Sequence, residues 1–80
     1  MMNWTNRIEQ KPGVMLGKPV IKGTRITVEL ILEALAEGST VADLLAAYPR
    51  LQPQDIQAAL AFAAAALSTE KTIFLEEKAV

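Results

Sequence analysis

The feature that most constrains this chain is a helical spacing of apolar residues that glycine and proline interrupt. From Thr27 onward, apolar residues recur at i, i+3, i+4 and i+7, the spacing of one buried helix face. They are Val28, Ile31, Leu32 and Leu35, and a second, solvated face carries Glu29, Glu33 and Glu37. Gly38 is placed to end this helix in the left-handed conformation. We therefore predict a first helix between Thr27 and Gly38.

A second, shorter helix is predicted from its capping residues. Thr40 is an N-cap candidate, and Asp43 follows three residues later, which makes a variant of the capping box. Pro49 disfavours helical geometry at Tyr48, the residue before it, so the helix must stop there. The second helix is therefore expected over residues 41–47.

The third helix begins after a short break. Pro53 suits the first helical position, Gln52 before it is a weak N-cap, and Asp55 falls in the first turn. The apolar pattern continues to Leu67, and seven of the nine residues at 58–66 are alanine. Such small side chains let another helix approach closely, either inside the core or at the seam of a dimer.

Ahead of the helices, the run GKPVIKGTR at residues 17–25 indicates a tight turn. Gly23 supplies the positive φ that a type II or hairpin turn needs over residues 21–24. Extended segments at 19–21 and 25–27 are expected to pair across this turn as a small β-hairpin. Pro19 has no N–H donor, so its strand starts there or lies at a sheet edge.

The same run does not match a phosphate-binding loop. A nucleotide-hydrolase loop needs Gly-x-x-x-x-Gly-Lys-Ser/Thr, whereas five residues separate Gly17 from Gly23, and Lys22 precedes Gly23. The Gly-x-Gly-x-x-Gly series of a dinucleotide site is also absent. The cations of this run therefore belong either to a purely structural turn or to a surface that contacts a polyanion.

Charge is distributed unevenly along the chain. Residues 1–27 hold five cations against Glu9 alone, whereas residues 28–80 hold three cations against eight carboxylates. The five are Arg7, Lys11, Lys18, Lys22 and Arg25. A polyanion should therefore prefer the N-terminal third.

The amino-acid composition excludes several classes of enzyme site. The 80 residues include no cysteine and no histidine, which removes disulfides, thiolate or imidazole metal sites and the usual nucleophile–base pairs. We expect no enzyme activity, no cofactor and no metal.

The first ten residues have no apolar signal region, and no run suits a membrane span. We expect a cytoplasmic location without membrane contact.

Three segments of the sequence resemble the small prokaryotic domain-of-unknown-function family number 433. They are PGVMLGKPVIKGTRITVELILEALAEG, LLAAYPRL and DIQAALAFAA. The resemblance covers roughly residues 4–67. It implies a homeodomain-like helix-turn-helix fold and an antitoxin encoded beside a toxin of the PIN-like nuclease type.

By position, the resemblance makes residues 17–25 the family's hairpin before the first helix. Tyr48 and Pro49 would form the turn of the helix-turn-helix, and the recognition helix would start at Pro53. The sequence departs from the family pattern at Gln52, where a better cap such as threonine is usual. It also departs at residues 41–42, where glutamates are usual. These departures weaken helix starts without changing the expected fold.

The first functional hypothesis is a DNA-binding antitoxin that represses its own operon. The second helix of a helix-turn-helix places its N-terminal residues near base edges, and glutamine can bond adenine in bidentate fashion. The third helix has Asp55 and no cation of its own, so the hairpin would have to supply phosphate contacts. The candidate nucleic-acid-binding residues are Lys18, Lys22, Arg25, Arg50, Gln52, Gln54 and Gln57.

The alternative is a protein-interaction module that neutralises a toxin without binding DNA. Its candidate partner-binding residues are Ile73, Phe74 and Leu75, an apolar patch between Lys71 and Lys78. This segment is either a frayed end or one that orders on a partner.

Each of three other residues has two possible roles, one structural and one functional. Trp4 either packs over the small core or anchors a partner. Tyr48 lies either against the helix junction or near a phosphate. Arg25 either pairs with Glu29 at i, i+4 or binds a polyanion.

Together these observations predict a mainly α-helical single domain. It has a three-helix, homeodomain-like helix-turn-helix core preceded by a short N-terminal β-hairpin. Residues 1–27 form the basic arm and hairpin, residues 28–67 the three helices and residues 68–80 a tail. A chain of this size buries only about 60% of its unfolded surface, so we also expect a homodimer.

Overall fold

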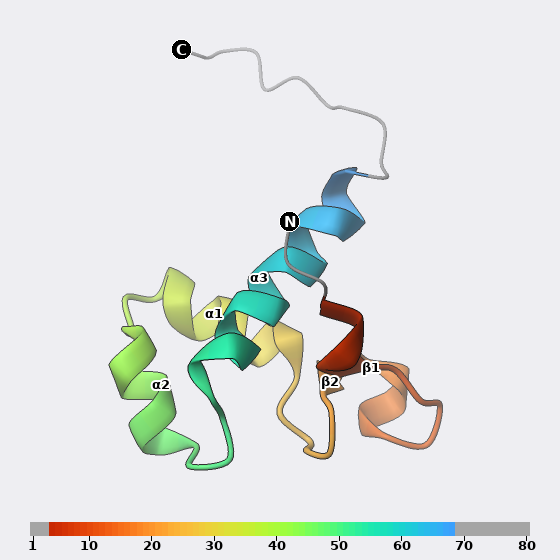
Figure 1. Ribbon diagram of the computed structural model, residues 1–80, viewed down its shortest axis with the longest axis horizontal. Helices are drawn as coiled ribbons and strands as arrows, with labels where there is room; N and C mark the ends of the chain where they lie inside the picture. The colour runs from red at the N-terminus through yellow and green to blue at the C-terminus, as the bar shows by residue number, and fades with distance from the viewer. Residues whose placement is uncertain (1–3, 69–80) are drawn as a thin grey trace.

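The computed structural model of the chain describes residues 4–68, which form three α-helices preceded by a two-stranded antiparallel sheet (Figure 1). The predicted mainly helical fold with an N-terminal hairpin is confirmed. In chain order, the elements are η1 (Trp4–Asn6), β1 (Ile8–Glu9), η2 (Met15–Gly17), β2 (Val20–Ile21), α1 (Val28–Ala36), α2 (Val41–Ala47) and α3 (Pro53–Ser68). The elements η1 and η2 are short 3-10 helices.

The predicted strand at residues 19–21 pairs with a different segment from the one expected. Strand β2 pairs with β1, an earlier segment that sequence reasoning did not identify, with Ile8 opposite Ile21. Residues 25–27, the expected partner, contribute only a single bridge between Val20 and Thr27. The pairing goes no further because α1 begins at the next residue, Val28. Thr27 is still extended, with a φ of -80° and a ψ of 153°, and as the N-cap its hydroxyl accepts a hydrogen bond from the Leu30 N–H at 2.9 Å.

The ends of the first helix follow from the residues predicted to form them. Gly38 has a φ of 104°. Its N–H donates to the Leu35 carbonyl at 3.1 Å, and the Ser39 N–H donates to the Ala34 carbonyl at 2.9 Å. These two bonds are the Schellman arrangement, which satisfies carbonyls left free at a helix end.

The predicted capping box of α2 is also present. The Thr40 N–H donates to Asp43 Oδ2 at 2.9 Å, and the Asp43 N–H donates to the Thr40 hydroxyl at 3.0 Å. The bond from the Thr40 backbone holds the pKa of the Asp43 carboxyl below its usual value. Local side chains therefore position α2 directly after α1.

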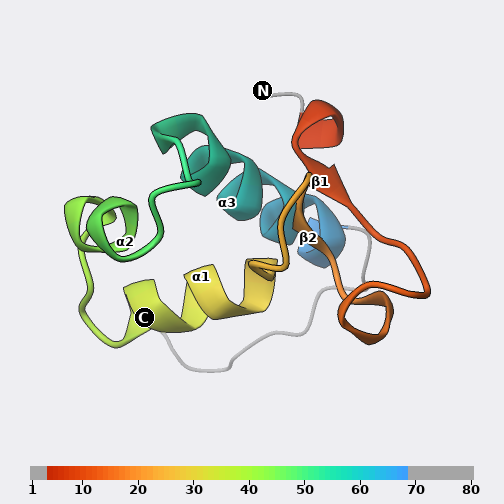
Figure 2. The same cartoon turned by 90° about the horizontal axis from the view of Figure 1, so that it is seen from below.

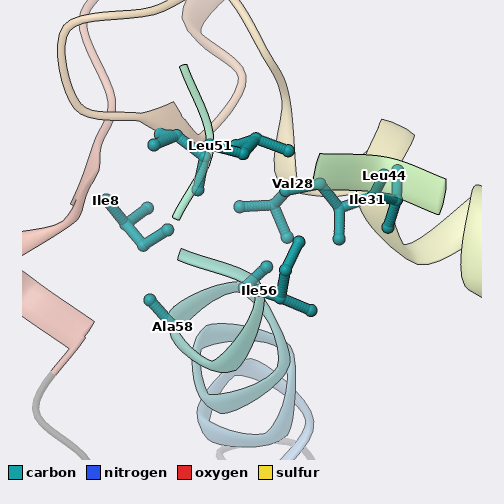
Figure 3. Packing of buried hydrophobic residues seen from close by; sticks show 9 residues of the cluster. Ile8, Val28, Ile31, Leu44, Leu51, Ile56 and Ala58 are labelled. Carbon is teal, nitrogen blue, oxygen red and sulfur yellow. The ribbon is translucent and has the colours of Figure 1, made fainter. Parts of the chain in front are cut away.

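One apolar core joins the sheet to all three helices. Figure 3 shows Val28, Ile31 and Ile56 lying close together between α1 and α3. Ile31 is fully buried and Ile56 is 2% exposed. The whole cluster consists of Ile8, Ile21, Val28, Ile31, Leu44, Leu51, Ile56, Ala58 and Ala59. Because both strands and all three helices contribute to this cluster, the turns between them are held at fixed relative positions.

The start of the described chain packs against the last helix. The Trp4 ring meets the Phe62 ring edge to face, with centroids 4.9 Å apart and an interplanar angle of 84°. Trp4 and Tyr48 are both partly buried against the core, as expected for their structural readings. The segment from Trp4 to Glu9 is therefore part of the folded body, not a free arm.

Leu16 offers a test of backbone strain. Met15, Leu16 and Gly17 all have positive φ, with Leu16 at 60° and 94% exposed. The left-handed conformation costs an L-residue about 1 to 2 kcal/mol, and glycine loses roughly 0.5 to 1 kcal/mol in backbone entropy on folding. We expect Leu16→Gly to raise the free energy of unfolding by about 0.5 kcal/mol, measured by thermal unfolding.

Leu16→Ala is the matched control for this variant. It removes the exposed side chain but keeps the Cβ atom that conflicts with the left-handed backbone. We expect no stabilisation from Leu16→Ala. An equal gain in both variants would show that strain at this position is not the cause.

Candidate nucleic-acid interface

The predicted reverse turn at residues 21–24 is confirmed. The Thr24 N–H donates to the Ile21 carbonyl at 3.0 Å, and Gly23 has a φ of 79°, as a type II turn requires at its third residue. The Thr24 hydroxyl donates to the same carbonyl at 2.8 Å and accepts from the Ile26 N–H at 3.0 Å. Lys22 within this turn and Arg25 directly after it are both exposed.

A second turn, at residues 48–52, joins α2 to α3 and contacts the first one. Leu51 anchors it in the core at 5% exposure, while Arg50 beside it is exposed. The Arg50 Nη2 atom donates to the Gly23 carbonyl at 2.9 Å, across 27 residues of sequence. Both turns lie at the lower end of the molecule in Figure 1, and Figure 2 views the molecule from that end. The structure therefore brings Lys22, Arg25 and Arg50 to one side, and we call these three residues the basic edge.

The start of α3 is held by a buried carboxylate. Asp55 is 5% exposed, and its Oδ2 atom accepts a hydrogen bond from the Gln52 N–H at 2.9 Å. Its Oδ1 atom accepts from Arg7 Nη1 at 2.9 Å, and the same nitrogen lies 3.4 Å from Gln52 Oε1. Asp55 is the one acidic residue of α3, and its charge faces Arg7 rather than solvent. The negative charge at the start of α3 is therefore paired with a cation within the fold.

The three candidate glutamines are all exposed at or near this end of α3. Gln52 is the residue before the helix, and Gln54 and Gln57 lie at i and i+3, so they share one helix face. Together with the basic edge they combine cations with side chains that both donate and accept hydrogen bonds. Within residues 4–68, Lys22 and Arg25 form no ion pair.

Lys18, the remaining candidate, lies elsewhere. Its Nζ atom is 2.9 Å from Glu29 Oε1, and this hydrogen bond raises the pKa of Lys18 above its usual value. Strand β2 lies between it and Lys22 along the chain. Glu29 had been one expected partner of Arg25, but in the structure it pairs with Lys18.

Two contributions to this surface were missed by sequence reasoning. Arg7 was considered only as a phosphate contact, yet it is the partner of Asp55, 48 residues away. Glu9 lies beside the first turn, where its carboxylate accepts from the Gly23 N–H at 3.3 Å and lies 3.6 Å from Lys11 Nζ. No local spacing signals the Arg7–Asp55 contact or the Glu9–Gly23 contact, because each joins segments that only the fold brings together.

Other classes of site have less support in the described part of the chain. Residues 4–68 contain no group of three acidic side chains placed to hold a metal ion. None of the helices there has both the length and the apolarity to cross a bilayer. The predicted partner-binding residues Ile73, Phe74 and Leu75 lie outside the described residues.

Comparison with known families places this surface in context. A family model described as Protein of unknown function (DUF433) matches residues 8–63. The chain belongs to the DUF433 family. The DUF433 match includes both turns and the start of α3, and it begins one residue after Arg7. The basic edge and its glutamines are therefore parts of the DUF433 domain itself.

A solved structure with a similar fold is the crystal structure of a DUF433 member protein from Anabaena variabilis. It has a TM-score of 0.75 and 32% sequence identity to this chain, with 81% of this chain and 64% of that chain covered. This DUF433 chain thus spans less than two thirds of its structural relative. A comparison with curated proteins gave no match.

Proposed function

We propose that this DUF433 protein binds double-stranded DNA through the basic edge and the start of α3. Its role would be that of an antitoxin-like repressor paired with a PIN-like nuclease toxin. The observation that carries the DNA proposal is the Arg50 to Gly23 hydrogen bond, which joins the cationic turn to the turn before α3. The toxin partner rests on the sequence resemblance to antitoxins.

The chemistry of the surface suits the two kinds of contact that DNA recognition needs. In a helix-turn-helix, the N-terminal residues of the second helix approach base edges in the major groove. Gln54 and Gln57 would be the base-reading side chains, since glutamine can bond both N6 and N7 of adenine. Lys22 and Arg25 would contact the flanking phosphates, which position a protein without reading sequence.

A second copy of the chain would strengthen this binding. Three cations on one basic edge are few for stable binding, whereas two copies would present six. Helix-turn-helix dimers contact half-sites about 34 Å apart along the duplex. For the dimer surface we propose residues 60–67 of α3, where Leu60 and Leu67 are 48% and 73% exposed.

The second candidate function is toxin binding without DNA. It is favoured by the same uncharged segment, residues 60–67, because the exposed apolar side chains of Leu60 and Leu67 suit a protein partner as well as a second copy. If this alternative holds, purification from native cells at low salt yields a protein partner and no DNA.

A mobility-shift titration tests the DNA proposal. The probe is the duplex upstream of the chain's own gene, compared with an unrelated duplex of equal length. We expect retardation of the upstream duplex at 50 mM salt and a loss of affinity of about 10³-fold by 200 mM, as six phosphate contacts would produce. Absence of any retarded species at 50 mM salt would refute DNA binding.

A further inference from the structure

A groove with an apolar floor runs between α1 and α2, and its volume is about 380 Å³. The apolar side chains that line it are Leu30, Ala34, Leu44, Ala47 and Tyr48. None of the residues of the basic edge lines it. Figure 2 shows α2 at the edge of the molecule away from β1 and β2. The groove reaches the proposed DNA interface at Tyr48, the first residue of the second turn.

The charged side chains of this groove are all acidic. They are Glu33 and Glu37 of α1 and Asp43 of α2. Asp43 already bonds the Thr40 N–H, whereas Glu33 and Glu37 are exposed and form no ion pair within residues 4–68. The rim therefore presents two carboxylates that are in no ion pair beside an apolar floor. Glu33 lies close enough to Lys18 for its charge to help raise the pKa of that lysine.

We propose that this groove, in addition to the DNA surface, binds a cationic amphipathic helix of a partner protein. The apolar floor would receive the apolar face of that helix, the mode by which helices dock in grooves. The acidic rim would pair with lysine or arginine side chains that flank the apolar face. A polyanion is disfavoured here because the groove itself carries only negative charge.

Residues 4–68 of a second copy offer a less suitable occupant. The uncharged helix face at residues 58–67 has no cations for the rim, and the basic edge has no exposed large apolar side chain. The loop that holds Lys11, Leu16 and Lys18 combines both, but its docking in the groove of another copy would be head to tail. Such contacts build open chains or rings rather than a two-fold dimer.

The test uses two synthetic 14-residue peptides with leucine at i, i+3, i+4, i+7 and i+11. One peptide has lysine on its polar face, and its twin has glutamate. Fluorescence anisotropy of the labelled peptides with the full chain at 50 mM salt gives their affinities. We expect the lysine peptide to bind about tenfold or more tightly than the glutamate peptide, because the rim selects by charge.

Ala47→Arg and Ala46→Arg form a matched pair of variants. Both residues are exposed on α2 and both changes add one cation, but only Ala47 lines the groove. We expect Ala47→Arg to abolish binding of the lysine peptide and Ala46→Arg to retain it. Changing Glu33 and Glu37 together to glutamine should weaken binding about threefold to tenfold, since exposed ion pairs each contribute little.

Three results would overturn the proposal. They are no binding of the lysine peptide at 1 mM, equal binding by the two arginine variants, or oligomers of the free chain that Ala47→Arg disperses. The last result would assign the groove to a second copy. A mobility shift with the Ala47→Arg variant distinguishes the two proposals. If the variant loses peptide binding but still binds DNA, the interaction that was lost is the one at the groove.

Discussion

Replacing Asp55 with alanine is expected to lower the free energy of unfolding by about 3 kcal/mol, because it removes two charge-assisted hydrogen bonds at a buried position. The carboxylate closes the start of α3 through the Gln52 N–H and ties the N-terminal segment to that helix through Arg7. For 80 residues at roughly 0.05 to 0.15 kcal/mol each, this loss is a large part of the total stability.

A double-mutant cycle with Arg7→Ala separates the ion pair from the helix cap. Urea unfolding followed by circular dichroism gives the free energy of unfolding for the single and double variants. The double variant should be less destabilised than the sum of the single ones, with a coupling of about 1 kcal/mol or more. If the losses in free energy of unfolding of the two single variants simply add, Asp55 stabilises the fold only as the cap of α3. Its contact with Arg7 then contributes nothing.

Changing Lys22 and Arg25 together to glutamine is expected to flatten the salt dependence of DNA binding. Each lost phosphate contact lowers the slope of log K against log salt by about 0.9, so the change is roughly 1.8 for one chain and 3.6 for two chains on the duplex. The affinity at 50 mM salt should fall uniformly across DNA sequences, because phosphate contacts do not read bases. The size of the change in slope thus also reports whether two copies bind.

Lys18→Gln is the matched control for this measurement. It removes one cation from the same third of the chain, but that cation is paired with Glu29 and lies beyond β2. We expect its slope to stay close to that of the unaltered chain. If Lys18→Gln flattens the slope as much as the change at Lys22 and Arg25, the contact surface is not the basic edge.

The three helices and their ends could be predicted because their signals are local. Thr40 and Asp43 cap α2 across three residues, and Gly38 ends α1 by its own backbone conformation. Pro53 begins α3 as expected, and the described part of the helix reaches Ser68, one residue beyond the predicted end. Each of these features depends on neighbours within one helical turn, which adjacent residues specify directly.

The sheet was predicted only in part because strand pairing is not local. The turn at Gly23 was correct, yet the main partner of β2 is β1, which lies before η2 in the chain. A two-residue strand such as Ile8–Glu9 has too few residues to show an alternating pattern. It becomes a strand because Ile8 can join the core while its backbone pairs with Ile21.

The sequence alone places positive charge in the first third and a turn at Gly23 among those cations. It also determined that a short break separates α2 from α3. Only the tertiary structure decided that Arg50 joins these two turns, that Arg7 balances Asp55 and that Lys18 is held away by Glu29. These contacts span 11 to 48 residues, and side chains that far apart meet only after the core has packed the elements together.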